Sequence, residues 1–389
     1  MQKDSLKSTQ VHGDSGTWSK TVTYDYTDES GAFPVGRINC IDYPIKGDYR
    51  RRVSYTRNTD SEEWEKADWI TGRISEISDW RTGDSMSAGQ IVYNKYAGAG
   101  TAMQVEYGTN QAKLNYLSSE SPDTTGFDQF GRIHYLKATN GSDSTIADVE
   151  YTYDRLHNPT GKDDTGPVLR NEDFTYDALS RLVSFDPEGP DNITDWELTA
   201  VGNWRKVEYD DTTIDSREHN PQNEITLHKE GTSQVTVKPK INGTDSYDLE
   251  GNLCEVPFDN AGTESQYLKF VYDAWNRLVC IADLNYCVVR AAYERDGLGR
   301  IIVNNSTHEH HYYSASWQLL STFDDDLEDD GLVKEYVWGL RYVDEIAATI
   351  NYGGSGNARY YQMQDANWNV IFTLSNAGSE LEAFQYDPY

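Results

Sequence analysis

Apolar and polar residues alternate along much of this chain. In segments 150–154 (EYTYD) and 174–185 (FTYDALSRLVSF), aromatic and aliphatic side chains fall on every second residue, with Thr, Ser and charged residues between them. A period of two predicts β-strands with one apolar face and one wet face. Helical periodicity is weak throughout. The best candidate, segment 61–70 (SEEWEKADWI), predicts at most one short helix with an N-terminal Ser cap.

The strand pattern recurs in tandem units. Alignment on the Asp of FTYDALSRL gives eight anchor positions, which are Asp128, Asp154, Asp177, Thr199, Asn220, Asp248, Asp273 and Asp296. Three residues after the anchors stand Gly131, His157, Ser180, Gly202, Asn223, Gly251, Asn276 and Gly299. Nearly all of these are small or tolerate a left-handed backbone. Asp or Asn first and Gly fourth is typical of a type I turn, in which the Asp side chain accepts a backbone N–H.

Each unit therefore predicts one β-hairpin. An apolar residue stands five positions after nearly every anchor, where the next strand opens, and the period is irregular, near 24 residues. Single hairpins are marginally stable, so consecutive hairpins must pair edge to edge. The predicted fold class is all-β, with tandem antiparallel hairpins in a continuous sheet that curves to hide its edges.

The repeats divide the chain into three segments. Residues 1–121 form an irregular N-terminal β segment with one early unit at 28–31 (DESG). Residues 122–307 hold the tandem repeats. Residues 308–389 have denser aromatic residues and motifs of their own.

Several of these motifs resemble those of a known family. The units at Tyr153-Asp154, Tyr176-Asp177, Tyr247-Asp248 and Tyr272-Asp273 resemble the YD repeats of the bacterial Rhs family. Segments 335–349 (EYVWGLRYVDEIAAT) and 360–389 (YYQMQDANWNVIFTLSNAGSELEAFQYDPY) resemble the repeat-associated core region of that family. The resemblance covers about two-thirds of the chain, from Phe127 onward.

The resemblance implies a ribbon of hairpins that spirals into a hollow shell, of which this chain forms part or all. Such shells lie within large secreted or cell-surface proteins. In polymorphic toxins the shell encloses a variable C-terminal toxin, and the core region plugs one end. Many members cut themselves after the core; this sequence stops at Asp387-Pro388-Tyr389, so self-cleavage is carried over to none of its residues.

We therefore expect a non-catalytic, encapsulating shell segment whose partner is an enclosed C-terminal toxin or effector. The alternative is a cell-surface adhesion or carbohydrate-binding module that uses exposed Tyr and Trp to bind a glycan or protein. A glycan-acting enzyme is a second, weaker alternative. The resemblance implies a secreted or cell-surface location, and no apolar signal segment opens this chain.

Charge narrows the choice of partner. The chain has 34 basic and 64 acidic residues, a net charge of −30. Such a field repels nucleic acid and anionic membranes and suits solubility, cations or a basic partner. No stretch approaches the ~18 apolar residues that a membrane span needs. We expect neither nucleic acid binding nor a membrane span.

No catalytic, cofactor or metal site is predicted. Turn chemistry already accounts for the repeated Asp residues, which otherwise suggest the paired carboxylates of glycosidases. Segment 323–331 (FDDDLEDDG) imitates the start of a calcium loop, but its twelfth position, counted from Asp326, is Val337 rather than Glu. His308 and His310 are expected on one strand face, and two ligands are too few for zinc. GxSxG, GxxxxGKS and HExxH motifs are absent.

The four cysteines form no CxxC pair. Cys40, Cys254, Cys280 and Cys287 are interpreted as isolated packed thiols. In an oxidising compartment, Cys280 and Cys287 could instead face each other across a hairpin and pair.

Overall fold

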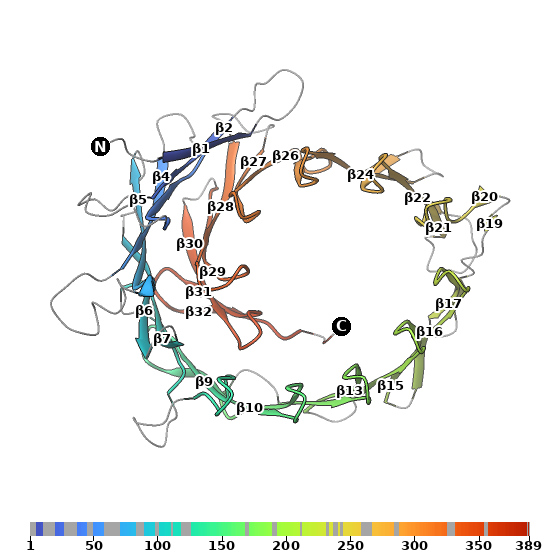
Figure 1. Cartoon of the computed structure of the whole chain (residues 1–389), viewed down its shortest axis with the longest axis horizontal. Coiled ribbons are helices and arrows are strands. Elements are labelled where there is room, and N and C mark those ends of the chain that lie inside the picture. Colours follow the sequence, from blue (N-terminus) through green and yellow to red (C-terminus); the bar gives the residue numbers. More distant parts are fainter. Residues whose placement is uncertain are drawn as a thin grey trace.

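The computed structural model shows a β-sheet ribbon that curls into a ring (Figure 1). The structure describes residues 5–10, 20–26, 37–44, 50–57, 71–82, 89–97, 101–109, 112–117, 126–167, 171–188, 193–210, 212–230, 233–235, 240–241, 244–257, 267–283, 288–324, 331–353, 357–386 and 388. The short helix predicted at 61–70 and the early unit at 28–31 lie outside these residues.

Within each sheet every strand pairs antiparallel with its neighbours in sequence. The first sheet has 18 strands, which are β1 (Ser5–Gln10), β2 (Lys20–Asp25), β3 (Cys40–Asp42), β4 (Arg50–Thr56), β5 (Glu76–Thr82), β6 (Gly89–Ala97), β7 (Thr101–Tyr107), β8 (Ala112–Asn115), β9 (Tyr135–Thr139), β10 (Thr145–Tyr153), β11 (Pro159–Asp164), β12 (Glu172–Tyr176), β13 (Leu182–Pro187), β14 (Thr194–Leu198), β15 (Trp204–Tyr209), β16 (Thr212–His219), β17 (Ile225–Glu230) and β18 (Ser233–Val235).

A two-stranded sheet and a 12-stranded sheet follow. The small sheet is β19 (Lys240–Ile241) and β20 (Thr244–Asp245). The larger one is β21 (Glu255–Pro257), β22 (Tyr267–Tyr272), β23 (Leu278–Asp283), β24 (Val288–Arg295), β25 (Ile301–Asn304), β26 (Glu309–Tyr313), β27 (Leu319–Asp324), β28 (Leu332–Trp338), β29 (Ile346–Asn351), β30 (Ala358–Gln364), β31 (Val370–Ser375) and β32 (Glu380–Ala383). The predicted fold class, a curved antiparallel sheet of tandem hairpins, is confirmed.

The main core lies where the two ends of the ribbon overlap. After one circuit, β28 to β32 turn inside the ring and lie against the first strands (Figure 1). One apolar cluster joins both ends, with Val53, Ile77 and Val105 from the early strands and Ile350 and Phe372 from the late ones. Where they overlap, each layer thus covers the apolar face of the other.

The opposite side of the ring has a smaller core. Leu182, Phe185, Trp196 and Val207, all on β13 to β15, form a separate cluster. These residues pack on neighbours in their own sheet, and the intervening positions face solvent, as the alternating sequence predicts.

A buried ionic cluster fastens the two layers together. Arg51 on β4 donates to Glu335 on β28 (Nε to Oε2, 2.6 Å) and to Asp79 on β5. Arg359 on β30 donates from Nη2 to both carboxylate oxygens of Asp79, at 2.7 and 2.8 Å. The Tyr352 hydroxyl bonds both Arg51 and Glu335. Two positive and two negative side chains are therefore sealed together, and we call these four the ionic clasp.

Further hydrogen bonds join residues about 300 positions apart. The Gln10 amide brackets the backbone of Tyr313, donating to its carbonyl at 2.6 Å and accepting its N–H at 3.0 Å. The Tyr43 hydroxyl donates to the Tyr336 carbonyl at 2.6 Å. These bonds close the ring where β1 meets the late strands (Figure 1).

The hydrogen-bonded sheets do not follow the three segments predicted from the sequence. The break between the large sheets falls between β18 and β21, and β26 to β32 continue the sheet that β21 begins. The division at residues 121 and 307 stays a prediction about domain organisation.

The ionic clasp gives a stability prediction. Arg51→Met leaves Asp79 and Glu335 buried with one positive partner between them, so we expect a loss of about 3–5 kcal/mol in the free energy of unfolding. The matched control is Arg205→Met, because the Arg205–Glu197 pair lies on the surface and should contribute only about 0–1 kcal/mol. Urea unfolding followed by fluorescence measures both; equal losses would contradict the prediction.

Candidate functional site

The repeated turns along one edge of the ribbon form the most regular site of the chain. At Asp177, the N–H of Ser180 donates to the Asp177 carbonyl at 3.0 Å, and the N–H of Asp177 donates to the Arg181 carbonyl at 2.9 Å. Ser180 has φ of 58°, and the strand register shifts beside it, between Thr175 and Tyr176. This is a type I turn closed by a left-handed bulge residue.

The same backbone geometry recurs in all eight units. The fourth residue of each has positive φ, as follows: Gly131 77°, His157 73°, Ser180 58°, Gly202 93°, Asn223 67°, Gly251 84°, Asn276 58° and Gly299 93°. A side chain in this region is strained unless it is absent or short and polar, which explains the residue types found there.

In six of the eight units the anchor is an Asp, and its carboxylate ties the turn together. Asp177 Oδ1 accepts the N–H groups of Leu179 (2.8 Å) and Arg181 (3.0 Å), and its Oδ2 accepts Arg181 Nε at 2.7 Å. The bond from the Arg181 side chain, helped by the backbone donors, lowers the pKa of Asp177 below its ordinary value. A carboxylate held charged in this way is a structural ligand of its own turn and is poorly placed to donate a proton.

The Tyr that precedes the anchor links one unit to the unit before it. Tyr153 donates its hydroxyl to the Ile133 carbonyl (2.6 Å), and Tyr272 donates to the Leu253 carbonyl (3.0 Å). Arg181 reaches the other way, from Nη1 to the Thr199 carbonyl of the next turn (2.8 Å). The Tyr-Asp pair therefore couples neighbouring hairpins as well as closing its own.

Two further turns of this kind lie along the same edge and were not predicted from the sequence. Ser314 and Asp365 anchor the same bond pattern, with Trp317 (φ 68°) and Trp368 (φ 65°) in the left-handed position. The segments SASWQLL and DANWNVIF carry the signal, an anchor followed five residues later by an apolar residue. A bulky Trp in a position that favours Gly or Asn concealed it.

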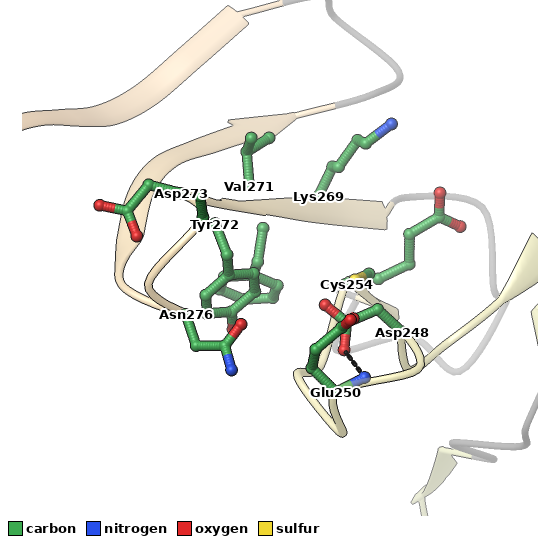
Figure 2. A pocket seen from close by; sticks show the side chains of 11 residues that line it. Asp248, Glu250, Cys254, Lys269, Val271, Tyr272, Asp273 and Asn276 are labelled. Carbon is green, nitrogen blue, oxygen red and sulfur yellow. Dashed lines mark hydrogen bonds between the residues drawn. The ribbon is translucent and has the colours of Figure 1, made fainter.

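A cavity of about 650 Å³ with a mixed polar and apolar lining lies between two successive turns (Figure 2). Asp248, Glu250, Cys254, Lys269 and Tyr272 are among its lining residues. Asp248 Oδ1 accepts the N–H of Glu250 at 3.0 Å, so this carboxylate is engaged in its own turn. Burial is the main cause that raises the pKa of the Cys254 thiol, which disfavours the nucleophilic thiolate.

The candidate metal ligands and the histidines singled out in the sequence are considered next by their positions in the structure. Among the described residues, no group of three His, Cys, Asp or Glu side chains could hold a metal ion. Asp326, Glu328 and Asp330 lie outside those residues. The expectation that His308 and His310 share a strand face is wrong, because His308 lies in a turn with φ of 58° before β26 begins. His310 is buried.

The cysteines are described only in part. Cys40, Cys254 and Cys280 are free thiols. The alternative pairing of Cys280 with Cys287 cannot be placed, since Cys287 lies outside the described residues.

The ring was compared with known proteins. No protein-family model matches the chain, and no curated protein matches it in sequence. Solved structures do match, over 99% of this chain. They include the Photorhabdus luminescens Tc holotoxin pore (12% identity, TM-score 0.55), TcdB2–TccC3–Cdc42 (13%, 0.62) and TcdB2–TccC3 (15%, 0.57).

This chain has an Rhs-like shell fold. The matched TcdB2–TccC3 chains are Rhs-repeat shell proteins, so the predicted resemblance is confirmed for the fold. Identities of 12–15% do not establish membership of the family from sequence. The chain spans about a fifth of the length of the chains it matches, which is 19–20%.

The left-handed turn position gives one prediction. Gly299→Val puts a β-branched residue at φ of 93° and should destabilise the protein by about 1–3 kcal/mol. Gly297→Val is the matched control, because Gly297 lies in the same turn without positive φ and a Cβ added there meets no atom within 4 Å. Thermal melting measures both, and an unchanged midpoint for Gly299→Val would contradict this role for the residue.

The bond between neighbouring hairpins gives another. Tyr272→Phe removes the hydroxyl that donates to the Leu253 carbonyl and should lower stability by about 0.5–1.5 kcal/mol. Tyr267→Phe is the control, since the buried Tyr267 hydroxyl has no hydrogen-bond partner among the described residues. We expect this control to be neutral or slightly stabilising. A loss as large for Tyr267→Phe would count against the inter-hairpin bond.

Proposed function

We propose that this chain is a section of a shell wall that encloses or presents a C-terminal effector in a secreted or cell-surface bacterial protein. One observation carries the proposal. Strands β28 to β32 leave the wall and turn into the ring, and β32 lies inside it (Figure 1). A segment that continued the chain from β32 would therefore start on the inner side of the wall.

The packing of the late strands supports this role. Phe372 and Leu374 on β31 are completely buried in the core shared with the first strands. The ionic clasp adds a specific fastening at β28 and β30. This packing should keep the inward-turning strands folded even when a disordered segment follows them.

The matched solved structures indicate what kind of segment the wall would surround. The matched structures contain TccC3, and one of them is TcdB2–TccC3 without its hypervariable C-terminal region. We carry over to this chain the idea of a wall that surrounds a variable C-terminal part. Because the chain spans about a fifth of the length of the chains it matches, we assign it one section of such a wall.

A non-catalytic role is part of the proposal. The anchor aspartates bond to their own turns, and hydrogen bonds and neighbouring charge keep the pKa of Asp177 and Asp273 low. A glycosidase needs one carboxyl group whose pKa is raised so that it can act as an acid. The cavity beside Asp248 lacks that arrangement among its described residues.

Adhesion or carbohydrate binding has less support. Sugar-binding aromatic side chains are most effective as a platform on one sheet face. Here two of the most exposed indoles, Trp275 and Trp317, lie at turn tips instead.

No helix among the described residues is long and apolar enough to cross a membrane.

The proposal can be tested with a protease site placed after residue 389 and, in a second variant, before residue 1. We expect slower cleavage of the site after residue 389, because β32 directs it into the ring. The two variants control for each other, and cleavage of both in urea shows that the sites are intact. Equal rates under native conditions, or electron micrographs of a solid particle without a central opening, would overturn the proposal.

A further inference from the structure

The tips of the turns carry an unexpected row of exposed apolar side chains. The third residue of six repeat turns, and the fourth of one more, is a large hydrophobic residue that is 56–75% exposed. These seven are Phe130, Leu156, Leu179, Val201, Trp275, Leu298 and Trp317. We call them the apolar edge. Turn tips in contact with water are usually polar, so this row requires an explanation.

All seven tips lie along one edge of the ribbon. Antiparallel strands joined in sequence place alternate connections at opposite edges, and the repeat turns are all of one parity. Hydrogen bonds show that neighbouring turns lie side by side. Arg132 reaches the Asp154 carbonyl (3.3 Å), and Arg277 reaches the Asp296 carbonyl (3.4 Å). With two strands per unit, the tips repeat about every 10 Å.

The opposite edge provides an internal comparison. Its tight turns at 140–143 (NGSD), 305–308 (NSTH) and 375–378 (SNAG) contain no large apolar residue. These turns meet the same demands of backbone geometry, since Asp143, His308 and Gly378 also have positive φ. Turn formation therefore does not require an apolar tip. The difference between the edges points to a contact made by one of them.

The apolar edge is also free of net charge. In each of the seven turns, the five residues from the anchor onward carry no net charge, although the whole chain carries −30. In four turns the anchor Asp is paired with the Arg four residues later, as in Asp177–Arg181. The three remaining turns, anchored at Asn220, Asp248 and Asp365, carry net negative charge. Two of them have Gln222 and Glu250 at the third position, and the turn at Asp248 also exposes Leu249. Neutral tips allow two such acidic chains to meet without strong repulsion.

We propose that the apolar edge is covered by the same edge of a second copy of this chain. A partner must offer apolar tips at the same spacing and along the same curve, and a second copy related by twofold symmetry does so. Each tip exposes on the order of 100 Å² of apolar surface. Seven tips give about 700 Å² per chain, close to the ~800 Å² per partner of a typical stable interface. Two rings then stack into a deeper wall.

Sedimentation of the intact chain over a range of concentrations tests the proposal. We expect a monomer–dimer equilibrium that shifts toward dimer at higher salt, because salt screens the repulsion between acidic chains. The triple variant Leu156→Lys, Leu179→Lys and Val201→Lys should raise the dimer dissociation constant by about a hundredfold or more. These side chains are exposed, so circular dichroism and melting temperature should stay unchanged.

The opposite edge supplies the matched control. The triple variant Ser142→Lys, Thr307→Lys and Asn376→Lys adds the same charge there and should leave the dimer intact. A wild-type chain that stays monomeric at all concentrations would overturn the proposal, as would a dimer that the triple variant does not weaken. A dimer of this chain that vanishes when further natural sequence is attached would also overturn it, since another part of the same chain would then cover the edge. These results test only the dimer, and the proposed enclosing role is tested separately by the protease sites.

Discussion

The ring depends on one small constraint, which is the anchor side chain that closes each turn, an aspartate in six of the eight units. Its two oxygens bind the backbone of the turn and the side chain four residues on, and this fixes the left-handed bulge. Beside the turn, the strand register shifts by one residue in six of the eight units, as between Thr175 and Tyr176. Bulges increase the local twist and bend of a strand. A sheet that bends equally at each repeat must curl, so curvature follows from the repeated turn.

The Tyr that precedes the anchor fixes how one hairpin lies against the hairpin before it. Its hydroxyl bonds the preceding unit, so neither the spacing nor the tilt of two hairpins is free. The sequence could predict only the turn and not the bond between hairpins. Five consecutive residues determine the turn, so the sequence predicted strands, turns and an all-β ribbon. The acceptor of the Tyr hydroxyl lies in the unit before, about 20 residues away, and a turn pattern does not specify it.

Longer-range features were beyond sequence analysis for the same reason. Arg51 and Glu335 are 284 residues apart, and nothing in either neighbourhood marks them as partners. Each reads as an ordinary charged residue in a strand. They meet because the ribbon completes a circuit and overlaps itself, so the contact is a product of accumulated curvature. The overlap also explains the density of aromatic residues after residue 308, since those strands are covered by a second layer and the side walls are not.

A curled ribbon has two kinds of edge, which are the edge of its terminal strand and the two long edges that carry the turns. The strand edge at β1 is bracketed at its end by the Gln10 amide, which binds the backbone of Tyr313 and so limits open-ended pairing. The turn-bearing edges have no unpaired ladder to hide. On one of them the tight turns at 140–143, 305–308 and 375–378 have no large apolar residue, and the other carries seven exposed apolar side chains, six of them at the third turn position, where backbone geometry leaves the residue type free. Selection of Phe, Leu and Trp at such free positions is most simply explained by a surface that packs against another like it.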